Sequence, residues 1–503
     1  MSFDKVEQPD KEKEEYKETL KNTSLFGGVQ IYWILTSIVE SKVVAIILGP
    51  EGMGILGLLK TTVRMIASST NLSLGICAVK NIASANSTKN WLAISETISV
   101  FRRLIFFTGL LGLLSCAVLS PFWSVLTFGD YSYTLTFVFL SVTLFIDQQS
   151  TGQNTLLQGM QRFRWMAKSK IYSSTAGLFF SIPLYYWKGE KAIVVVIIIA
   201  SLINLLLSWH FSKRIKLPKI KLDLRLVLSK GKEMLHTGFF FSLKNFLPVT
   251  SAYLIRTFIN HRGGIADVGL FYAGFALVNT YSGLVLSAMA TDYYPRLSVA
   301  RQTDVFNTTI NRQMEVGILL ISPLIILFTI YSDILIQLLY STKFLAINSM
   351  LYWMMLGVFF QVMSWTISFS FLAKSDGKGY FINELVSNIY LLILNVSFYY
   401  EWGLTGLGVS FLIGYIIYFI QVFMVCHQRF NYRFSMSILP AIVKQFIICL
   451  CCFLLIFFAS TTMKYILGTL LLIISLYFSL NILNQRMGLK DILKNQWARF
   501  NKK

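Results

Sequence analysis

Stretches of about 20 consecutive, mostly apolar residues recur along nearly the whole chain of 503 residues, and this recurrence constrains the fold more than any other feature. An α-helix needs about 20 such residues to cross the hydrocarbon layer of a bilayer. Only 14% of the residues are charged, compared with roughly 25% in soluble domains. The sequence therefore predicts an all-α integral membrane protein.

The apolar stretches predict about fourteen transmembrane helices. We expect them at residues 25–48, 53–79, 104–128, 133–157, 168–187, 191–212, 236–260, 267–292, 316–340, 347–372, 380–400, 404–426, 438–460 and 463–483.

The distribution of Lys and Arg predicts how these helices are oriented. The chain has 45 Lys and Arg residues against 24 Asp and Glu, and cationic loops are retained on the cytoplasmic side. Lys and Arg gather in alternate connecting segments, and the other segments hold only Lys188, Lys191, Arg262, Lys343 and Lys464. We therefore expect an even number of helices with both termini in the cytoplasm. Membrane topology explains most of the positive charge, so no nucleic-acid partner is expected.

The most basic connecting segment divides the sequence near its middle. Residues 213–232 read KRIKLPKIKLDLRLVLSKGK, and a weak internal repeat at an offset of about 215 residues relates the two sides. The expected organisation has two six-helix bundles and two further helices. Its parts are an N-terminal cytoplasmic tail (1–24), a first bundle (25–212), a basic linker (213–235), a second bundle (236–426), helices 13 and 14 (438–483) and a C-terminal tail (484–503).

Five cations fall within the predicted spans. A charge in the hydrocarbon layer costs a few kcal/mol, so such residues usually face a wet cavity or a partner. Lys60 and Arg64 are four residues apart and share a helix face, where they repel unless an anion joins them. We expect Lys42, Lys60, Arg64, Lys244 and Arg256 to line a cavity that receives an anionic headgroup. The alternative for Lys42 and Arg256 is that they snorkel to the outer surface.

Three acidic residues within the spans, Glu40, Asp147 and Glu384, are candidates for coupling to a proton or sodium gradient, or for structural ion pairs. The six cysteines show no metal-ligand or disulfide spacing. Residues 52–57 fit G-x-G-x-x-G, but they enter a membrane helix without a preceding strand, which excludes dinucleotide binding. We therefore expect no metal and no cofactor apart from an ion gradient.

Three segments resemble a known family. The segments TSLFGGVQ (23–30), KVVAIILGPEGMGILGLL (42–59) and AMATDYYPRLS (288–298) are similar to O-antigen translocases. These are Wzx-type flippases of the multidrug/oligosaccharidyl-lipid/polysaccharide exporter superfamily. The fourteen-helix layout matches along the whole chain, whereas the specific motifs cover only the entrances of the two bundles.

The resemblance implies two helical bundles around a central cavity that opens alternately to either face of the bacterial inner membrane. It implies translocation of an undecaprenyl-pyrophosphate-linked oligosaccharide, with membrane lipids, a polysaccharide polymerase and assembly proteins as partners. The resemblance assigns the binding of the pyrophosphate to Lys60, Arg64 and Arg256, because of their depth in the membrane and the helices that carry them. Asp292 and Arg296 would lie at a cytoplasmic gate.

Two other functions compete with this interpretation. A multidrug antiporter of the same superfamily usually takes organic cations, which a cationic cavity would repel. A membrane glycan polymerase would be an enzyme and would need a large outer loop to hold its acceptor, whereas the predicted outer loops are all short. We therefore expect a transporter and not an enzyme.

Overall fold

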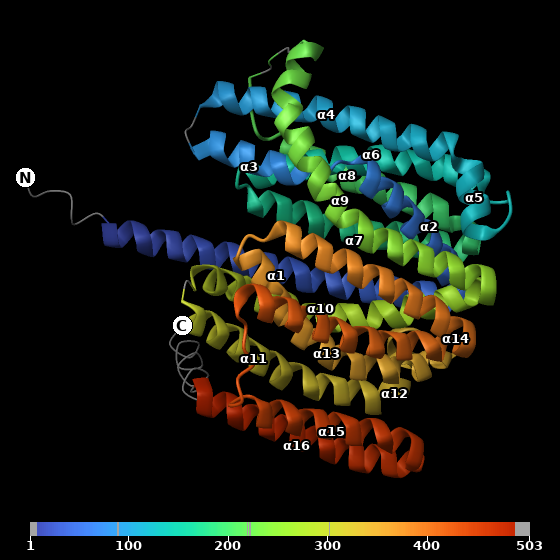
Figure 1. Ribbon diagram of the computed structural model, residues 1–503. Helices are drawn as coiled ribbons and strands as arrows, with labels where there is room; N and C mark the ends of the chain where they lie inside the picture. The colour runs from blue at the N-terminus through green and yellow to red at the C-terminus, as the bar shows by residue number, and fades with distance from the viewer. Residues whose placement is uncertain (1–7, 88–89, 219, 221–222, 301, 488–503) are drawn as a thin grey trace, which may run out of the picture. The chain divides into compact units, whose positions relative to one another are not determined.

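The computed structural model describes residues 8–87, 90–218, 220, 223–300 and 302–487, and the regular structure within these ranges is helical throughout (Figure 1). The side chains of residues 8–26, Leu224, Lys244 and Met487 lie outside this description. The chain forms two compact units, which we call unit 1 (through His261) and unit 2 (from Arg262). Each is described by itself.

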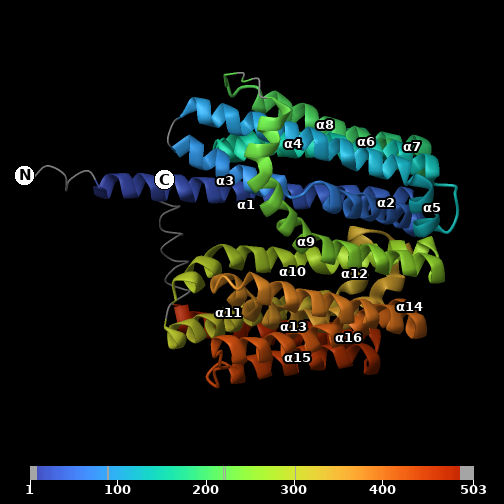
Figure 2. The ribbon, with the colours of Figure 1, turned by 45° about the horizontal axis from the view of Figure 1, so that its top comes forward.

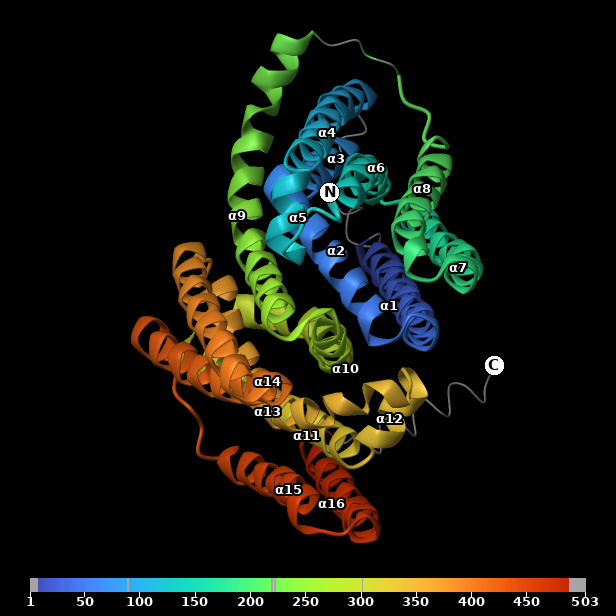
Figure 3. The same ribbon diagram turned by 90° about the vertical axis from the view of Figure 1, so that its right-hand side faces the viewer.

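Unit 1 contains a bundle in which helices far apart in sequence lie side by side. Helix α4 packs against α6, α6 against α8, α7 against α8, and α1 against α7 (Figure 3). The helices are α1 (Gln8–Ile47), α2 (Gly49–Thr70), α3 (Leu74–Ser87), α4 (Trp91–Val118), α5 (Ser120–Phe128), α6 (Thr134–Gly159), α7 (Phe163–Lys188), α8 (Ala192–Ser212) and most of α9 (Leu224–Gly263).

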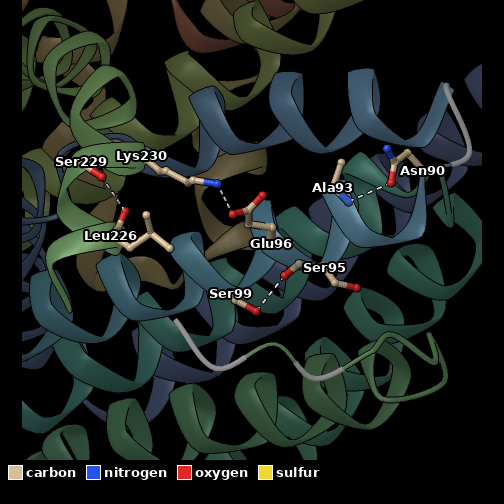
Figure 4. A network of polar contacts seen from close by, with 8 residues as sticks. All are labelled: Asn90, Ala93, Ser95, Glu96, Ser99, Leu226, Ser229 and Lys230. Carbon is tan, nitrogen blue, oxygen red and sulfur yellow. Dashed lines mark hydrogen bonds and ion pairs between the residues drawn. The ribbon is translucent and has the colours of Figure 1, made fainter. Parts of the chain in front are cut away.

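One end of α9 packs against α3, α4 and α6 of unit 1. Val227 and Met234 of α9 are buried in one apolar cluster with Phe101 of α4. Burying a large apolar side chain contributes about 1.5–3 kcal/mol. Figure 4 shows Lys230 of α9 reaching Glu96 of α4, with which it forms an ion pair. Apolar contacts and this ion pair together hold the start of α9 on unit 1.

The other end of α9 also contacts unit 1. The hydroxyl groups of Thr127 and Tyr253 lie 2.9 Å apart, and Asn260 donates a hydrogen bond of 2.9 Å to the carbonyl oxygen of Thr127. The boundary between the two compact units therefore lies after His261, whereas the sequence predicted a boundary at the linker 213–235. The assignment of residues 236–260 to the second bundle stays a prediction.

Unit 2 is arranged around α11 and α13. Helix α11 packs against α13, α15 and α16, and α13 packs against α14 (Figure 2). The helices are α10 (Ile265–Val299), α11 (Thr303–Ile330), α12 (Ser332–Leu339), α13 (Asn348–Ala373), α14 (Gly377–Phe430), α15 (Leu439–Phe458) and α16 (Thr461–Met487).

The long element α14 is a pair of helices joined at Gly403. This glycine has φ 55° and ψ −137°, a conformation that side-chain-bearing residues rarely adopt. The hydroxyl of Ser410 donates a hydrogen bond of 2.9 Å to the Asn395 side chain, which ties the two arms together. The arms correspond to the separate helices predicted at 380–400 and 404–426.

The first arm of α14 begins at a capping carboxylate. Asp376 accepts a hydrogen bond of 2.8 Å from the backbone N–H of Gly379, and Arg429 from the end of the second arm lies 2.6 Å from the same carboxylate. These two contacts hold the pKa of Asp376 below its usual value. The cap and the ion pair fix both ends of the α14 hairpin at one place.

Each of the fourteen predicted ranges falls on a helix, but several helix ends differ. Helix α1 begins at Gln8, within the range predicted as a tail, because residues 8–20 are rich in Glu and Lys, which favour helices. The range 53–79 covers both α2 and α3, which are separated where Leu72 and Ser73 have positive φ. The range 104–128 covers α4 and α5, and Pro121 lies at the start of α5.

Nine helical stretches among the described residues are long and apolar enough to cross a membrane, and two of them, 163–212 and 377–430, each contain two successive helices. The protein is therefore a multi-pass membrane protein. Helices α2, α6 and α9 are not among these nine apolar stretches. They carry several of the charged candidates, including Arg64, Asp147 and Arg256, and charged residues lower the mean hydropathy of a helix.

Candidate functional site

The structure brings two predicted site residues of unit 1 together. Lys60 of α2 lies 3.5 Å from the carboxylate of Glu40 in α1, and their side chains are 32% and 38% exposed. Gly49, with φ 68°, allows the sharp turn between the two helices that places these residues side by side. Glu40 is thus an anion beside the cations of α2, and it compensates the charge of Lys60.

Arg64 adds positive charge to the face of α2 that carries Lys60. Arg64 lies one turn beyond Lys60 on α2 and is exposed, and Lys42 of α1 is half-buried. Because Glu40 balances Lys60, Arg64 leaves this face of α2 with a positive balance. Such a face attracts anions and repels organic cations.

Arg256 of α9 is the most buried of the predicted cations whose side chains are described. Its side chain is 8% exposed, and its guanidinium donates a hydrogen bond of 2.9 Å to the carbonyl oxygen of Ala252. A buried cation is costly unless anions or hydrogen-bond acceptors surround it. Lys244, on the same helix, has a side chain outside the described part.

Polar side chains of residues 147–155 in α6 mostly form hydrogen bonds to neighbouring helices. The Gln148 amide donates to the hydroxyl of Thr108 in α4 at 2.8 Å, and Ser150 contacts Ser208 of α8 at 3.3 Å. Hydrogen bonds of this kind stabilise helix contacts in membranes. Asp147 is on the exposed side of α6.

In unit 2, Glu384 lies among tyrosines that the sequence analysis did not single out. The Tyr418 hydroxyl donates a hydrogen bond of 2.6 Å to the Glu384 carboxylate. The neighbouring Tyr415 accepts one of 2.9 Å from Gln361 of α13. The three-residue spacing of Tyr415 and Tyr418 on one helix face is the signal that could have pointed to them.

The predicted gate residues Asp292 and Arg296 form an ion pair of 2.7 Å within α10. Arg296 also donates to the Gln313 side chain of α11 at 3.2 Å, which links the two helices. Both residues line a cavity of about 1480 Å³ within unit 2.

The same cavity contains an ion pair that the sequence analysis missed. Glu315 of α11 is 5% exposed and lies 3.5 Å from Arg486 of α16. The predicted span 316–340 and the predicted tail 484–503 placed these two residues outside the membrane helices. Within the part of the chain that the structure describes, no group of three His, Cys, Asp or Glu side chains could hold a metal ion.

The fold defines a class of proteins, the multi-pass helical membrane proteins. The structure of the lipid II flippase MurJ in an inward closed conformation matches with a TM-score of 0.68 at 14% identity, over 93% of this chain and 99% of that chain. A multidrug resistance MATE family transporter of the MOP superfamily matches with a TM-score of 0.61 at 15% identity, over 80% of this chain and 94% of that chain. The protein therefore has the MATE/MurJ fold.

The family follows from sequence comparison. A family model described as "Polysaccharide biosynthesis protein" matches residues 43–349, and the chain belongs to this family. A Shigella flexneri protein provisionally named an O-antigen transporter is 25% identical over 395 residues, which are 74% of this chain and 88% of that protein. The resemblance to the polysaccharide exporters is confirmed, as is the prediction of a transporter rather than an enzyme.

Proposed function

We propose that this protein is a flippase that moves an undecaprenyl-pyrophosphate-linked oligosaccharide across the bacterial inner membrane by alternating access. The family is one of polysaccharide biosynthesis, and its Shigella flexneri relative carries the name of an O-antigen transporter. The observation that carries the proposal is the positive charge on α2, where Glu40 balances Lys60 but not Arg64. An anionic cargo suits this charge.

The charge also separates this function from the multidrug antiport of proteins with the same fold. A fold match at 15% identity does not distinguish a glycolipid cargo from a drug. An organic cation entering beside Arg64 would meet net repulsion, whereas a pyrophosphate would gain charge-assisted hydrogen bonds. Multidrug antiport therefore remains the second candidate function, and only the fold that this protein shares with the antiporters supports it.

Different residues take different parts in the proposed cycle. Arg64 and Arg256 bind the pyrophosphate, with Lys42 and Lys244 adding positive charge along its route. Lys60 exchanges its contact with Glu40 for a contact with the phosphate. Asp292 and Arg296 form part of a cytoplasmic gate.

The driving force in this proposal is a proton or sodium gradient. Glu384 and Asp147 are the acidic groups we assign to coupling, in addition to Glu40. The hydrogen bond from Tyr418 supports a role for Glu384, because it holds an acidic side chain in one orientation inside unit 2.

The proposed topology has fourteen membrane-spanning helices, in two bundles of six followed by α15 and α16, with both termini in the cytoplasm. The spans comprise the nine apolar stretches, two of them counted as pairs, together with α2, α6 and α9. A reporter fused after residue 503 should show cytoplasmic placement. Periplasmic placement would contradict this topology.

Substitution of Arg64 tests the function directly. In a strain that lacks its own flippase, we expect Arg64→Ala to abolish most of the surface glycan, while the amount of protein in the membrane is unchanged. The control Arg214→Ala removes an exposed arginine of unit 1 that contacts His210 and Phe211, and it should retain surface glycan. Surface glycan at the wild-type level in Arg64→Ala would place the anion site elsewhere.

A further inference from the structure

Polar residues follow one line along α6. Asp147, Thr151, Asn154 and Gln158 are spaced by four, three and four residues, and at about 100° per residue they lie within an arc of about 60°. At a rise of about 1.5 Å per residue, this line is about 16 Å long. Asp147, Thr151 and Gln158 are exposed, and Asn154 is half-buried. We call these four residues the α6 stripe.

The other polar residues in this part of α6 join it to neighbouring helices. Gln148 bonds to α4 and Ser150 contacts α8, and the side-chain oxygen of Gln153 accepts a hydrogen bond of 2.6 Å from Ser212 of α8. These residues lie outside the arc of the α6 stripe. Contacts with neighbouring helices therefore explain the polar flanks of α6, but they do not explain the neutral polar groups of the stripe.

The neutral residues of the stripe keep unused hydrogen-bonding capacity. The Thr151 hydroxyl donates a hydrogen bond of 2.9 Å to the carbonyl oxygen of Asp147 within α6, and its oxygen can still accept one. Within the part of the chain that the structure describes, the side-chain oxygen of Asn154 has no hydrogen-bond partner. An unsatisfied amide costs free energy until water or a ligand supplies the partner.

The surroundings of the stripe follow from the place of α6 among the proposed membrane-spanning helices. Polar side chains within a membrane face the interior of the protein or a water-filled space. Because three of the four side chains are exposed, a water-filled space is what surrounds them. The stripe therefore presents hydroxyl, amide and carboxylate groups to water, which together offer donors and acceptors with a single charge.

The depth of the stripe relates it to the proposed pyrophosphate site. The Gln148 side chain donates a hydrogen bond of 3.4 Å to the carbonyl oxygen of Asn71, the residue that follows α2. Arg64 lies seven residues earlier, about 10 Å along α2. In the proposed topology α2 and α6 run in the same direction, so the stripe continues inward from the depth of Arg64. Sugars attached to a pyrophosphate at Arg64 would then lie along the stripe.

We infer that the α6 stripe binds the sugars of the lipid-linked oligosaccharide, with Thr151, Asn154 and Gln158 forming hydrogen bonds to sugar hydroxyl groups. The inference rests on the proposed flippase function and adds to it the residues that select the glycan. A site built to bond to a hydroxyl rejects a cargo without that hydroxyl, because the polar groups of the site then lose their partners. Asp147 keeps its proposed role in coupling.

Binding of two lipids to the purified full-length protein provides the test. The probes are undecaprenyl pyrophosphate and the undecaprenyl-pyrophosphate-linked glycans extracted from the bacterium that encodes this chain. Both should raise the Tm in a saturable manner, because a ligand that binds only the folded state stabilises it. The glycan-linked lipids should bind more tightly, since their sugars add hydrogen bonds.

The triple variant Thr151→Val/Asn154→Leu/Gln158→Met keeps the approximate shape of each side chain and removes its polar groups. It should weaken the binding of the glycan-linked lipids about tenfold or more, since three hydrogen bonds are lost, and leave the affinity for undecaprenyl pyrophosphate unchanged. The control Gln302→Met alters an exposed glutamine of unit 2 and should change neither affinity. Arg64→Ala should weaken the binding of both probes, because both carry the pyrophosphate.

The two probes separate a failure of this inference from a failure of the flippase proposal. Equal affinity of the wild-type protein for both probes, or an unchanged affinity for the glycan-linked lipids in the triple variant, would overturn the inference alone. Loss of undecaprenyl pyrophosphate binding in the triple variant would show that the stripe does not act on the sugars. Binding of rhodamine 6G that the triple variant loses would assign the stripe to an organic cation. If neither lipid binds the wild-type protein, the flippase proposal is wrong as well.

Carboxyl labelling of the unmodified protein covers the case in which the triple variant does not fold. Asp147 heads the stripe and is exposed, so bound glycan-linked lipids should slow its reaction with a water-soluble carbodiimide severalfold, whereas undecaprenyl pyrophosphate should not. Labelling of Glu51, an exposed carboxylate at the start of α2, is the control and should be the same with both probes. Equal labelling of Asp147 with the two probes would refute the inference.

Discussion

The double variant Glu40→Lys/Lys60→Glu, which reverses the ion pair, should regain the stability that each single substitution lowers. It should not regain transport. The carboxylate and the ammonium lie 3.5 Å apart, and at this distance two unit charges attract by about 5 kcal/mol at an effective dielectric constant of 20 and about 1 kcal/mol in water. Both side chains are about a third exposed, so solvent screening favours the lower end of this range. We expect a coupling energy of about 1 kcal/mol.

The single substitutions create like charges at this place. Glu40→Lys puts another cation beside Lys60 and Arg64, and Lys60→Glu brings two carboxylates together. Each should lower the Tm of the purified protein, and the double variant should regain most of the loss. Surface glycan should remain low in the double variant, because the cation is then on α1 rather than on α2, where we propose that it contacts the pyrophosphate.

The ion pair between Glu96 and Lys230 is a matched control (Figure 4). It also joins two helices of unit 1, and we assign it no part in transport. Its double reversal should retain both stability and surface glycan. A coupling energy below about 0.3 kcal/mol at Glu40 and Lys60 would contradict the ion pair. Full glycan export by their double reversal would refute the binding role of Lys60.

Three further substitutions test other parts of the structure. Asp376→Ala should cost about 1 kcal/mol at pH 7 through the lost helix cap. Because the folded-state pKa of Asp376 is lowered, the difference in Tm from wild type should shrink as the pH falls below about 4, and an undiminished difference at pH 3 would contradict a charged cap. Gly403→Ala should destabilise the protein by about 1–3 kcal/mol, because Gly403 has a positive φ. The control Gly177→Ala, in α7 with open space around it, should be neutral or stabilising. Equal Tm values for the two variants would argue against strain at Gly403. Tyr418→Phe removes the 2.6 Å hydrogen bond to Glu384 and should reduce glycan export severalfold at unchanged protein abundance, so unimpaired export would remove Glu384 from the coupling proposal.

The sequence by itself determined the membrane class, the helix positions and the family. Hydropathy acts over each segment of about 20 residues independently of the rest of the chain, so the apolar stretches predicted where helices lie without knowledge of their neighbours. The motifs at 42–59 and 288–298 pointed to the polysaccharide exporters, and the match to residues 43–349 confirmed that family. The charged residues that interrupt α2, α6 and α9 could also be recognised from the sequence as candidate site residues, because a charge within an apolar segment is a local feature.

Only the tertiary structure decided which charged side chains meet. Glu40 compensates Lys60 because the turn at Gly49 brings α1 and α2 together, and Glu315 meets Arg486 across 171 residues of sequence. Successive residues of a helix point about 100° apart, so an error of one residue in the end of a helix or in its packing moves a charge to another face. Ion pairs act over a few ångströms and depend on that rotation, and the partners of a charge in a membrane bundle therefore follow from how the helices pack rather than from the order of the residues.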